Sequence, residues 1–146
     1  MKFIGLDVGD KTIGIAVSDG LMLTAQGIMT LERVGIRKDA GKIIDMAKEY
    51  GCTGIVVGLP LMLSGSDSIQ TEKVREFARM LENKIRSTGE SIEVILHDER
   101  FSTKMAEDIL ISADVSRKKR KEVIDKQAAI IILQSYMDGL KYKNTL

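Results

Sequence analysis

The spacing of hydrophobic residues changes along the chain, and the change separates predicted strands from predicted helices. Near the N-terminus, apolar residues dominate the stretches Lys2–Val8 and Thr12–Ser18, which predict two strands joined as a hairpin by the turn Gly9–Lys11. A third extended segment is expected over Leu21–Met29. The first part of the chain is therefore predicted to form three successive strands.

Helical and strand patterns alternate in the middle of the chain. After Arg37–Asp39 the apolar residues are spaced as one face of a helix, which is expected to end at Gly51. The continuous apolar run Gly54–Gly58 is typical of a strand covered on both faces. An amphipathic helix over Val74–Ile85 and another strand over Ile92–Leu96 follow. Such alternation predicts parallel strands connected by right-handed crossovers.

Two helices are expected in the last third of the chain, over Lys104–Ile111 and about Glu122–Gly139. The complete order predicts an α/β fold. It contains a mixed five-stranded sheet, with the first three strands antiparallel and the later strands parallel, flanked by helices on both faces. With 146 residues and 44% hydrophobic content, residues 1–146 are expected to form a single domain.

Composition says more about where the protein is expected to work than about what it does. The net charge is only +1, so any nucleic-acid partner must be bound by a local patch. The sequence has no apolar run near 18 residues and no cleavable leader, so we expect no membrane span or signal peptide. A single cysteine, Cys52, fits a reducing cytoplasm, and its place beside an apolar run favours a small buried side chain over a nucleophile.

Acidic residues occur where strands are predicted to end. Asp7 lies in an apolar stretch, where an unpaired carboxylate would cost several kcal/mol unless it is paired, protonated or bound to a metal. Asp98 and Glu99 follow the strand that ends at Leu96. Because ligands gather at the carboxyl ends of strands in open sheets, these acids are expected to meet in space.

A third inward-facing acid is predicted on the last helix. Asp125 shares a helical face with Ala128, Ala129 and Ile132. Three clustered carboxylates would raise one another's pKa unless a divalent cation held them, and oxygen ligands of this kind suit Mg²⁺ or Mn²⁺.

Each acid also has a structural interpretation. Asp7 could bond turn amides or pair with Lys11, and Asp98 or Glu99 could simply be solvated after the strand. Asp125 could pair with Arg100. From spacing alone these alternatives stay open.

Basic residues near the acids are candidates for phosphate contacts. Five consecutive bases precede Asp125, namely Arg117, Lys118, Lys119, Arg120 and Lys121. Such a run is more often a solvated loop, but its position one turn ahead of an acid favours phosphate binding. Lys11 and Arg100, close in sequence to Asp7 and Glu99, could act in the same way. His97, the only histidine, adjoins the acids, and a structural role is favoured over acid–base work.

Four motifs carry a resemblance over nearly the whole chain: GLDVGDKTIGIAVSD, VGLPLMLSGSDSIQTEKVREFARML, HDERFST and VIDKQAAIIILQSYMD. In order and spacing they resemble the YqgF family, bacterial Holliday junction resolvase-like proteins regarded as nucleases of pre-16S ribosomal RNA. The resemblance implies a ribonuclease H-like fold and a catalytic, metal-binding triad of Asp7, Glu99 and Asp125. The chain departs from the family pattern at Met62, where Asn is usual, and at Phe101, where Leu is common.

The implied chemistry is phosphodiester hydrolysis with two bound cations, Mg²⁺ or Mn²⁺. The implied role is maturation of the 5′ end of pre-16S ribosomal RNA in the cytoplasm, with structured RNA as substrate and the assembling small ribosomal subunit as a further partner. Few aromatic residues are present, so recognition should depend on backbone and shape.

Other functions remain open at this point. The first motif also resembles the phosphate-binding hairpin of actin-like ATPases, but those proteins duplicate the fold and this chain has no repeat. A non-catalytic nucleic-acid or ribosome-assembly binding module is another alternative. Within the nuclease interpretation, a four-way DNA junction is the alternative substrate. Because paired cleavage of a junction calls for a symmetric dimer and no dimer face is evident, we expect a monomer or weak dimer.

Overall fold

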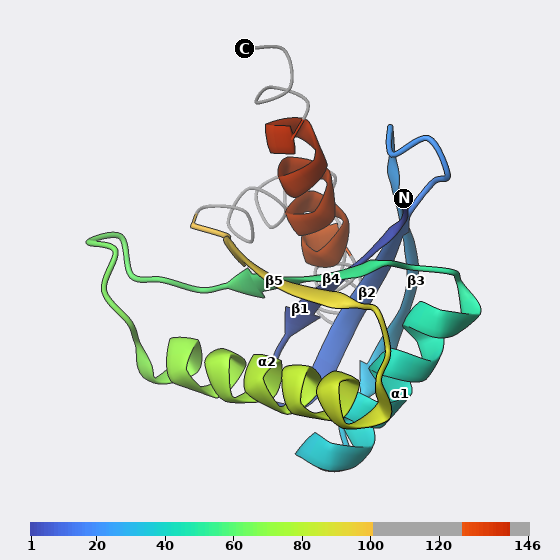
Figure 1. Cartoon of the computed structure of the whole chain (residues 1–146). Helices are drawn as coiled ribbons and strands as arrows, with labels where there is room; N and C mark the ends of the chain where they lie inside the picture. The colour runs from blue at the N-terminus through green and yellow to red at the C-terminus, as the bar shows by residue number, and fades with distance from the viewer. Residues whose placement is uncertain (101–126, 141–146) are drawn as a thin grey trace.

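One mixed sheet organises the protein. The computed structural model describes residues 1–100 and 127–140. Within these residues the strands are β1 (Phe3–Val8), β2 (Thr12–Ser18), β3 (Ala25–Glu32), β4 (Gly54–Leu59) and β5 (Glu93–Asp98). Their order in the sheet is β3-β2-β1-β4-β5 (Figure 1). The β1–β2 and β2–β3 pairs are antiparallel, whereas β4 is parallel to β1 and β5 is parallel to β4. The predicted mixed sheet is confirmed.

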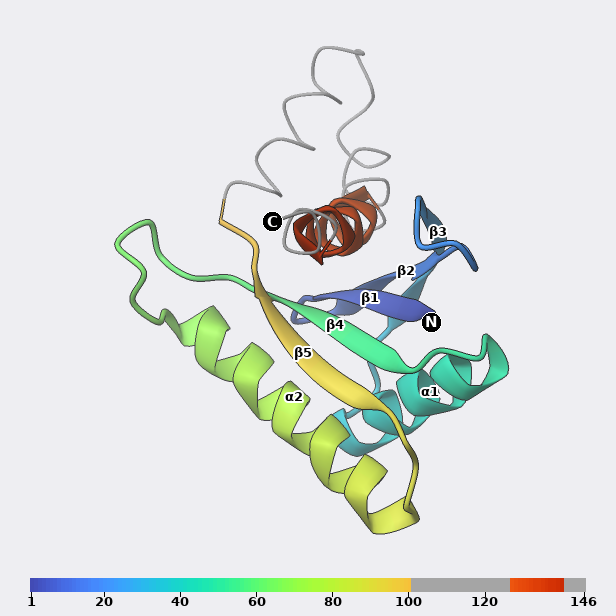
Figure 2. The ribbon, with the colours of Figure 1, turned by 45° about the horizontal axis from the view of Figure 1, so that its top comes forward.

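Helices cover both faces of this sheet. The helices α1 (Ile36–Glu49) and α2 (Ile69–Thr88) pack on one face. The C-terminal helix, residues 127–140, lies on the opposite face (Figure 2). The predicted helix over Lys104–Ile111 and the start of the last helix lie outside the described residues. No helix in the described part of the chain is long and apolar enough to span a membrane.

Alternation along β1 and β4 explains how one sheet serves two different layers. Successive strand residues face opposite sides, so every second residue shares a layer. The residues that face α1 and α2 are all branched aliphatic: Ile4, Leu6, Val8, Ile55, Val57 and Leu59. The residues in between, facing the C-terminal helix, are mixed in size and polarity: Phe3, Gly5, Asp7, Gly54, Val56 and Gly58.

The glycine at position 5 determines how closely the C-terminal helix approaches. A Cβ atom on Gly5 would lie 2.7 Å from Leu133 Cβ and 3.3 Å from the Ala129 carbonyl oxygen. Real Cβ atoms do not tolerate the first distance, so the helix backbone packs directly on the strand backbone only because residue 5 is glycine.

The third strand begins later than the sequence predicts. It spans Ala25–Glu32, whereas Leu21–Met29 was expected to be extended. The cause is Asp19, whose Oδ1 accepts a hydrogen bond from the Leu23 amide at 2.7 Å and whose Oδ2 accepts one from the Thr24 hydroxyl at 3.2 Å. These bonds fold the preceding residues into a turn, a local competition with strand pairing that aspartate makes readily.

Both helices on the first face start earlier than their apolar patterns predict. Asp39 is fully buried and its side chain accepts hydrogen bonds from Val34 and Gly35 amides, so α1 begins at Ile36. A capping box between Ser68 and Thr71 starts α2. The predicted ends are close to those observed, and Cys52 is buried as expected.

Candidate active site

Two of the three predicted acids lie on the same face of the sheet, near the carboxyl ends of its parallel strands. Asp7 is the penultimate residue of β1 and is half-buried. It is two residues from Gly5, which contacts the C-terminal helix, and so it faces the same side. Glu99 follows β5 directly, and its amide donates a hydrogen bond to the Leu59 carbonyl at 3.2 Å. This bond continues the β4–β5 pairing and fixes the backbone that carries the Glu99 carboxylate.

The side chain of Glu99 lies across β4 at Gly58. A Cβ atom on Gly58 would lie 2.6 Å from Glu99 Oε2 and 2.5 Å from Cδ1 of Ile132 on the C-terminal helix. Any larger residue would therefore displace the Glu99 carboxylate and the tip of the Ile132 side chain. Sequence reasoning treated Gly58 only as the end of an apolar strand. The available signal was a glycine at the carboxyl end of a buried strand, where close approach of another group is a common reason for glycine.

Burial gives Glu99 an unusual charge state. The residue is only 8% exposed, and its Oε2 atom is buried without a hydrogen-bond partner among the described residues. Burial, followed by the negative charges of Asp7 and Asp98, raises the pKa of Glu99 to about 8. A buried carboxyl oxygen with no donor nearby is costly, and it calls for an explanation in a native site.

A divalent cation would supply that explanation. Carboxylate oxygens of Asp7 and Glu99 are the donor type that Mg²⁺ and Mn²⁺ prefer, so these residues fit such an ion. Within residues 1–100 and 127–140, no group of three His, Cys, Asp or Glu side chains could hold a metal. Asp125, the third predicted ligand, lies outside the described residues. Ala128, Ala129 and Ile132, the predicted partners on its helical face, are fully buried.

Asp98 takes a different role from its neighbour Glu99. Arg100 donates hydrogen bonds from Nε to Asp98 Oδ2 at 2.8 Å and from Nη1 to the Leu63 carbonyl at 3.3 Å. The hydrogen bond from Arg100 is the main cause of the lowered pKa of Asp98. Arg100, predicted to contact phosphate, thus ties the end of β5 to the loop that follows β4.

His97 packs against the C-terminal helix rather than against the acids. Its Nε2 lies 3.0 Å from the Ser135 hydroxyl, and its ring meets Tyr136 edge-on with centroids 5.8 Å apart. Burial lowers the pKa of His97, which favours the neutral ring. These contacts support the structural interpretation of this histidine.

Only some of the residues predicted to contact phosphate lie in the described part of the chain. Lys11 is exposed in the turn between β1 and β2, at the same end of the sheet as Asp7. The five consecutive bases, Arg117, Lys118, Lys119, Arg120 and Lys121, lie outside the described residues.

Comparison with known sequences gives a consistent set of relatives. The model of the RuvX family, described as "Holliday junction resolvase", matches residues 1–139. A Clostridium tetani protein is 44% identical over 143 residues, covering 98% of this chain and all of that protein. A Clostridioides difficile protein is 50% identical over 137 residues, covering 94% of each. Both carry the name "Putative pre-16S rRNA nuclease".

Solved structures share the fold at low sequence identity. Fowlpox virus resolvase, solved with Holliday junction DNA, matches with a TM-score of 0.61 and 13% identity, covering 96% of this chain and 99% of the resolvase. Thermus thermophilus RuvC, also with a junction substrate, matches with a TM-score of 0.54 and 12% identity, covering 94% and 96%. The ribonuclease H-like fold class predicted from the sequence is confirmed.

Proposed function

The chain belongs to the RuvX family, and from this premise we propose that it is a metal-dependent nuclease that hydrolyses phosphodiester bonds. The names of its relatives favour pre-16S ribosomal RNA as the substrate. We propose maturation of the 5′ end of this RNA as the role. The observation that carries the proposal is the Glu99 carboxylate, buried over Gly58 with one oxygen unpartnered in the described residues, on the same sheet face as Asp7. A divalent cation bound at this face would offset the cost of burying that oxygen.

Asp7, Glu99 and Asp125 are the proposed metal ligands. Bound divalent cations, two Mg²⁺ or Mn²⁺ ions, would supply water activation and charge stabilisation at the scissile phosphate. The protein contributes position. Asp7 is held by β1 at the centre of the sheet, and Glu99 is held by the hydrogen bond from its amide to the Leu59 carbonyl oxygen. Ligands fixed by strand backbones lose little freedom when an ion binds, which favours binding.

Substrate contacts are proposed for the cations around this edge of the sheet. Lys11 lies exposed at the correct end, and Arg100 lies beside the acids with its guanidinium held by Asp98. The run Arg117 to Lys121 precedes Asp125 in the sequence and completes the proposed set. We propose structured RNA as the substrate and the assembling small ribosomal subunit, in the cytoplasm, as its setting.

A four-way DNA junction is the second candidate substrate. It is favoured by the description of the RuvX family as a Holliday junction resolvase. The relatives that share 44% and 50% of their sequence with this chain carry names that refer to ribosomal RNA instead. The RNA substrate is therefore the first choice.

The test is cleavage of three end-labelled substrates: pre-16S RNA, single-stranded RNA and a four-way DNA junction. The purified chain is assayed with Mg²⁺, Mn²⁺ or EDTA, beside Asp7→Asn, Glu99→Gln and the control Glu93→Gln. Glu93 is an exposed acid at the start of the same strand, β5. Loss of a metal ligand should lower cleavage by more than about 100-fold, because even residues that only support ligands account for 10–100-fold.

The outcome separates the alternatives. Cleavage that requires metal, disappears in Asp7→Asn and Glu99→Gln and persists in Glu93→Gln would support the proposal, and the substrate that is cut identifies the role. Binding without cleavage of any substrate, unchanged in Asp7→Asn, would replace the nuclease with a binding module.

A further inference from the structure

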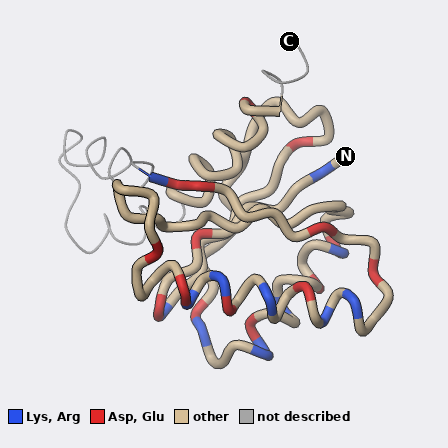
Figure 3. Tube along the Cα trace, turned by 60° about the vertical axis from the view of Figure 1, so that its left-hand side comes forward, with Lys and Arg blue, Asp and Glu red and all other residues tan. Residues whose placement is uncertain are grey.

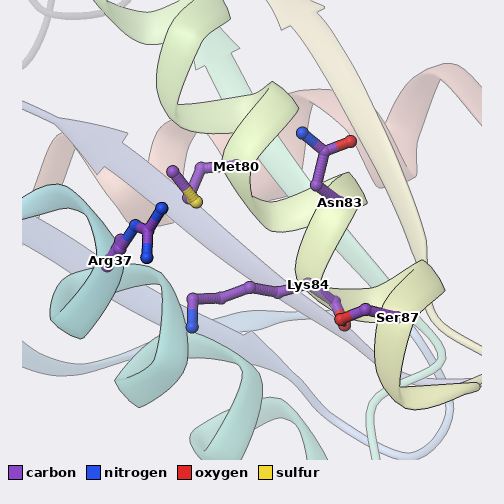
Figure 4. A pocket seen from close by; sticks show the side chains of 5 residues that line it. All are labelled: Arg37, Met80, Asn83, Lys84 and Ser87. Carbon is purple, nitrogen blue, oxygen red and sulfur yellow. The ribbon is translucent and has the colours of Figure 1, made fainter.

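A groove with a basic lining separates α1 from α2 on the side of the protein away from the candidate site. It consists of two adjoining hollows of about 340 and 370 Å³, both lined by Arg37 of α1 and Lys84 of α2. Lys38 and Lys42 add two further cations, and Asp45 is the one acid in the lining. In Figure 4 the side chains of Arg37 and Lys84 extend from the two helices into the space between them.

The cations of this groove outnumber its one acid, Asp45. Arg37, Lys38, Lys42 and Lys84 form no ion pair with any residue in the described ranges. Three other cations on the same helices do have partners: Lys48 pairs with Glu90 at 3.0 Å, Lys73 with Asp10 at 3.2 Å and Arg75 with Asp67 at 2.9 Å. Arg79 and Arg86 of α2 form no ion pair within the described residues either, but they do not line the groove.

The groove differs from the rest of the helical layer in the number of cations gathered at one place. Acidic and basic residues alternate along both helices (Figure 3). Four cations nevertheless face one hollow that holds a single carboxylate. Like charges at one place repel, and an anion relieves that repulsion.

The other groups in the lining suit a phosphodiester. Asn83 adds an uncharged amide, and Met80, which packs partly buried against the core, also lines the groove. Phosphate oxygens accept hydrogen bonds from arginine, lysine and amide donors together, and such contacts position a nucleic acid without reading its sequence. An acidic peptide would be attracted by the basic side chains of the groove alone and would have no particular need for the Asn83 amide.

The groove and the candidate site lie in different layers. Asp7 and Glu99 face the C-terminal helix, whereas α1 and α2 cover the opposite side of the sheet (Figure 2). A nucleic acid that contacts both places must pass around an edge of the sheet. Only a long or folded substrate can do this, and a short single strand at the site cannot reach the groove.

We propose that the groove between α1 and α2 binds backbone phosphates of the structured nucleic-acid substrate, at a distance from the bond that is cut. This proposal rests on the proposed nuclease function. In this arrangement the layer of α1 and α2 selects a structured substrate, whereas cleavage takes place on the opposite face of the sheet.

The experiment measures binding and cleavage separately. Binding of fluorescent pre-16S RNA to the full chain is followed by anisotropy in EDTA over a series of KCl concentrations. The test variant is Arg37→Gln/Lys84→Gln. The control is Lys48→Gln/Arg86→Gln, which removes two charges from the same two helices outside the groove. Cleavage of a short single-stranded RNA with Mg²⁺ is measured for both.

Loss of two phosphate contacts should weaken RNA binding about 5- to 10-fold. It should also reduce the slope of log K against log salt by about 1.5, since each contact contributes 0.7 to 0.9. The control should stay within about 2-fold, and kcat/KM on the short RNA should not change in either variant.

Two results would overturn the proposal in distinguishable ways. If the wild type binds and cuts RNA while the groove variant behaves as the control does, only the groove is excluded, and an acidic protein segment becomes the alternative occupant. If the wild type neither binds nor cuts nucleic acid, the nuclease function fails and the groove proposal fails with it.

Discussion

The two faces of the sheet are built from the same strands yet differ in composition. On the face covered by α1 and α2, every inward residue of β1 and β4 is Ile, Leu or Val, and Phe77 and Leu81 of α2 pack on them without exposed surface. On the face covered by the C-terminal helix, the same strands present Gly5, Asp7 and Gly58.

This difference separates stability from chemistry. Branched aliphatic side chains fill space and remove apolar surface from water, which stabilises the fold. Glycines on the other face remove side chains, so a helix backbone and a carboxylate can lie against the strands. The first face should therefore tolerate substitutions that preserve folding, whereas small changes on the second should alter activity.

The largest loss of stability is expected from the first face. Phe77→Ala removes a fully buried aromatic side chain and should lower the free energy of unfolding by about 3–5 kcal/mol. The ring also lies 5.2 Å from the Arg33 guanidinium, a contact that disappears. Urea unfolding measures the loss. Cleavage per folded molecule, at a temperature where the variant is folded, should remain within about 3-fold of the wild type.

Large loss of cleavage by folded Phe77→Ala would contradict the separation of the two faces. It would mean that packing under α2 controls the position of the acids across the sheet.

A smaller substitution on the second face should have the opposite profile. Gly58→Ala adds one methyl group, within 2.6 Å of both Glu99 Oε2 and Ile132 Cδ1, and should cost about 1–3 kcal/mol as overpacking does. Because the Glu99 carboxylate must move, we expect cleavage to fall by more than 10-fold.

Gly41→Ala is the matched control for this substitution. Gly41 lies within α1, and a Cβ atom there would have no neighbour within 4 Å. Alanine favours the helix by roughly 0.5–1 kcal/mol over glycine, so this variant should be slightly more stable. Because Gly41 borders the groove between α1 and α2, activity is compared on a short single-stranded RNA, which should be cut as fast as by the wild type. Equal activity of the Gly58→Ala variant and the control would remove Gly58 from the site.

Hydrophobic patterns in the sequence predicted the strands and helices but not all of their boundaries. Strand and helix patterns sufficed for the sheet, because continuous apolar runs such as Gly54–Gly58 and helical spacing such as that of Val74 and Phe77 are local signals. Boundaries set by side-chain hydrogen bonds were missed. Asp19 delays β3 and Asp39 advances α1, and neither bond is visible in hydrophobic spacing.

The candidate site was predictable in its residue types and less so in its geometry. Asp7 and Glu99 were placed together because acids at strand ends meet in a parallel sheet, and the raised pKa of Glu99 agrees with a close Asp7. The division of roles between Asp98 and Glu99 depends on the direction in which each side chain points at the end of β5 and on the position of Arg100. The need for glycine at position 58 depends on a contact between residues far apart in the sequence.

The last prediction is a pH dependence that isolates Glu99. Its pKa rises from an ordinary value of 4.5 in the unfolded chain to about 8 in the folded protein. Between these values the unfolded chain releases a proton that the folded protein retains, so the stability contributed by this group falls as pH rises and is constant above about 8. The slope is at most about 1.4 kcal/mol per pH unit.

The measurement compares wild type with Glu99→Gln in EDTA. Between pH 5 and pH 8, the unfolding free energy of the wild type should fall relative to that of the variant. Mg²⁺ should reduce this trend in the wild type alone, because a cation stabilises the ionised carboxylate. A difference that does not change with pH would show that Glu99 finds a hydrogen-bond donor in solution, and the case for a metal at this face would then rest on Asp7 and Asp125.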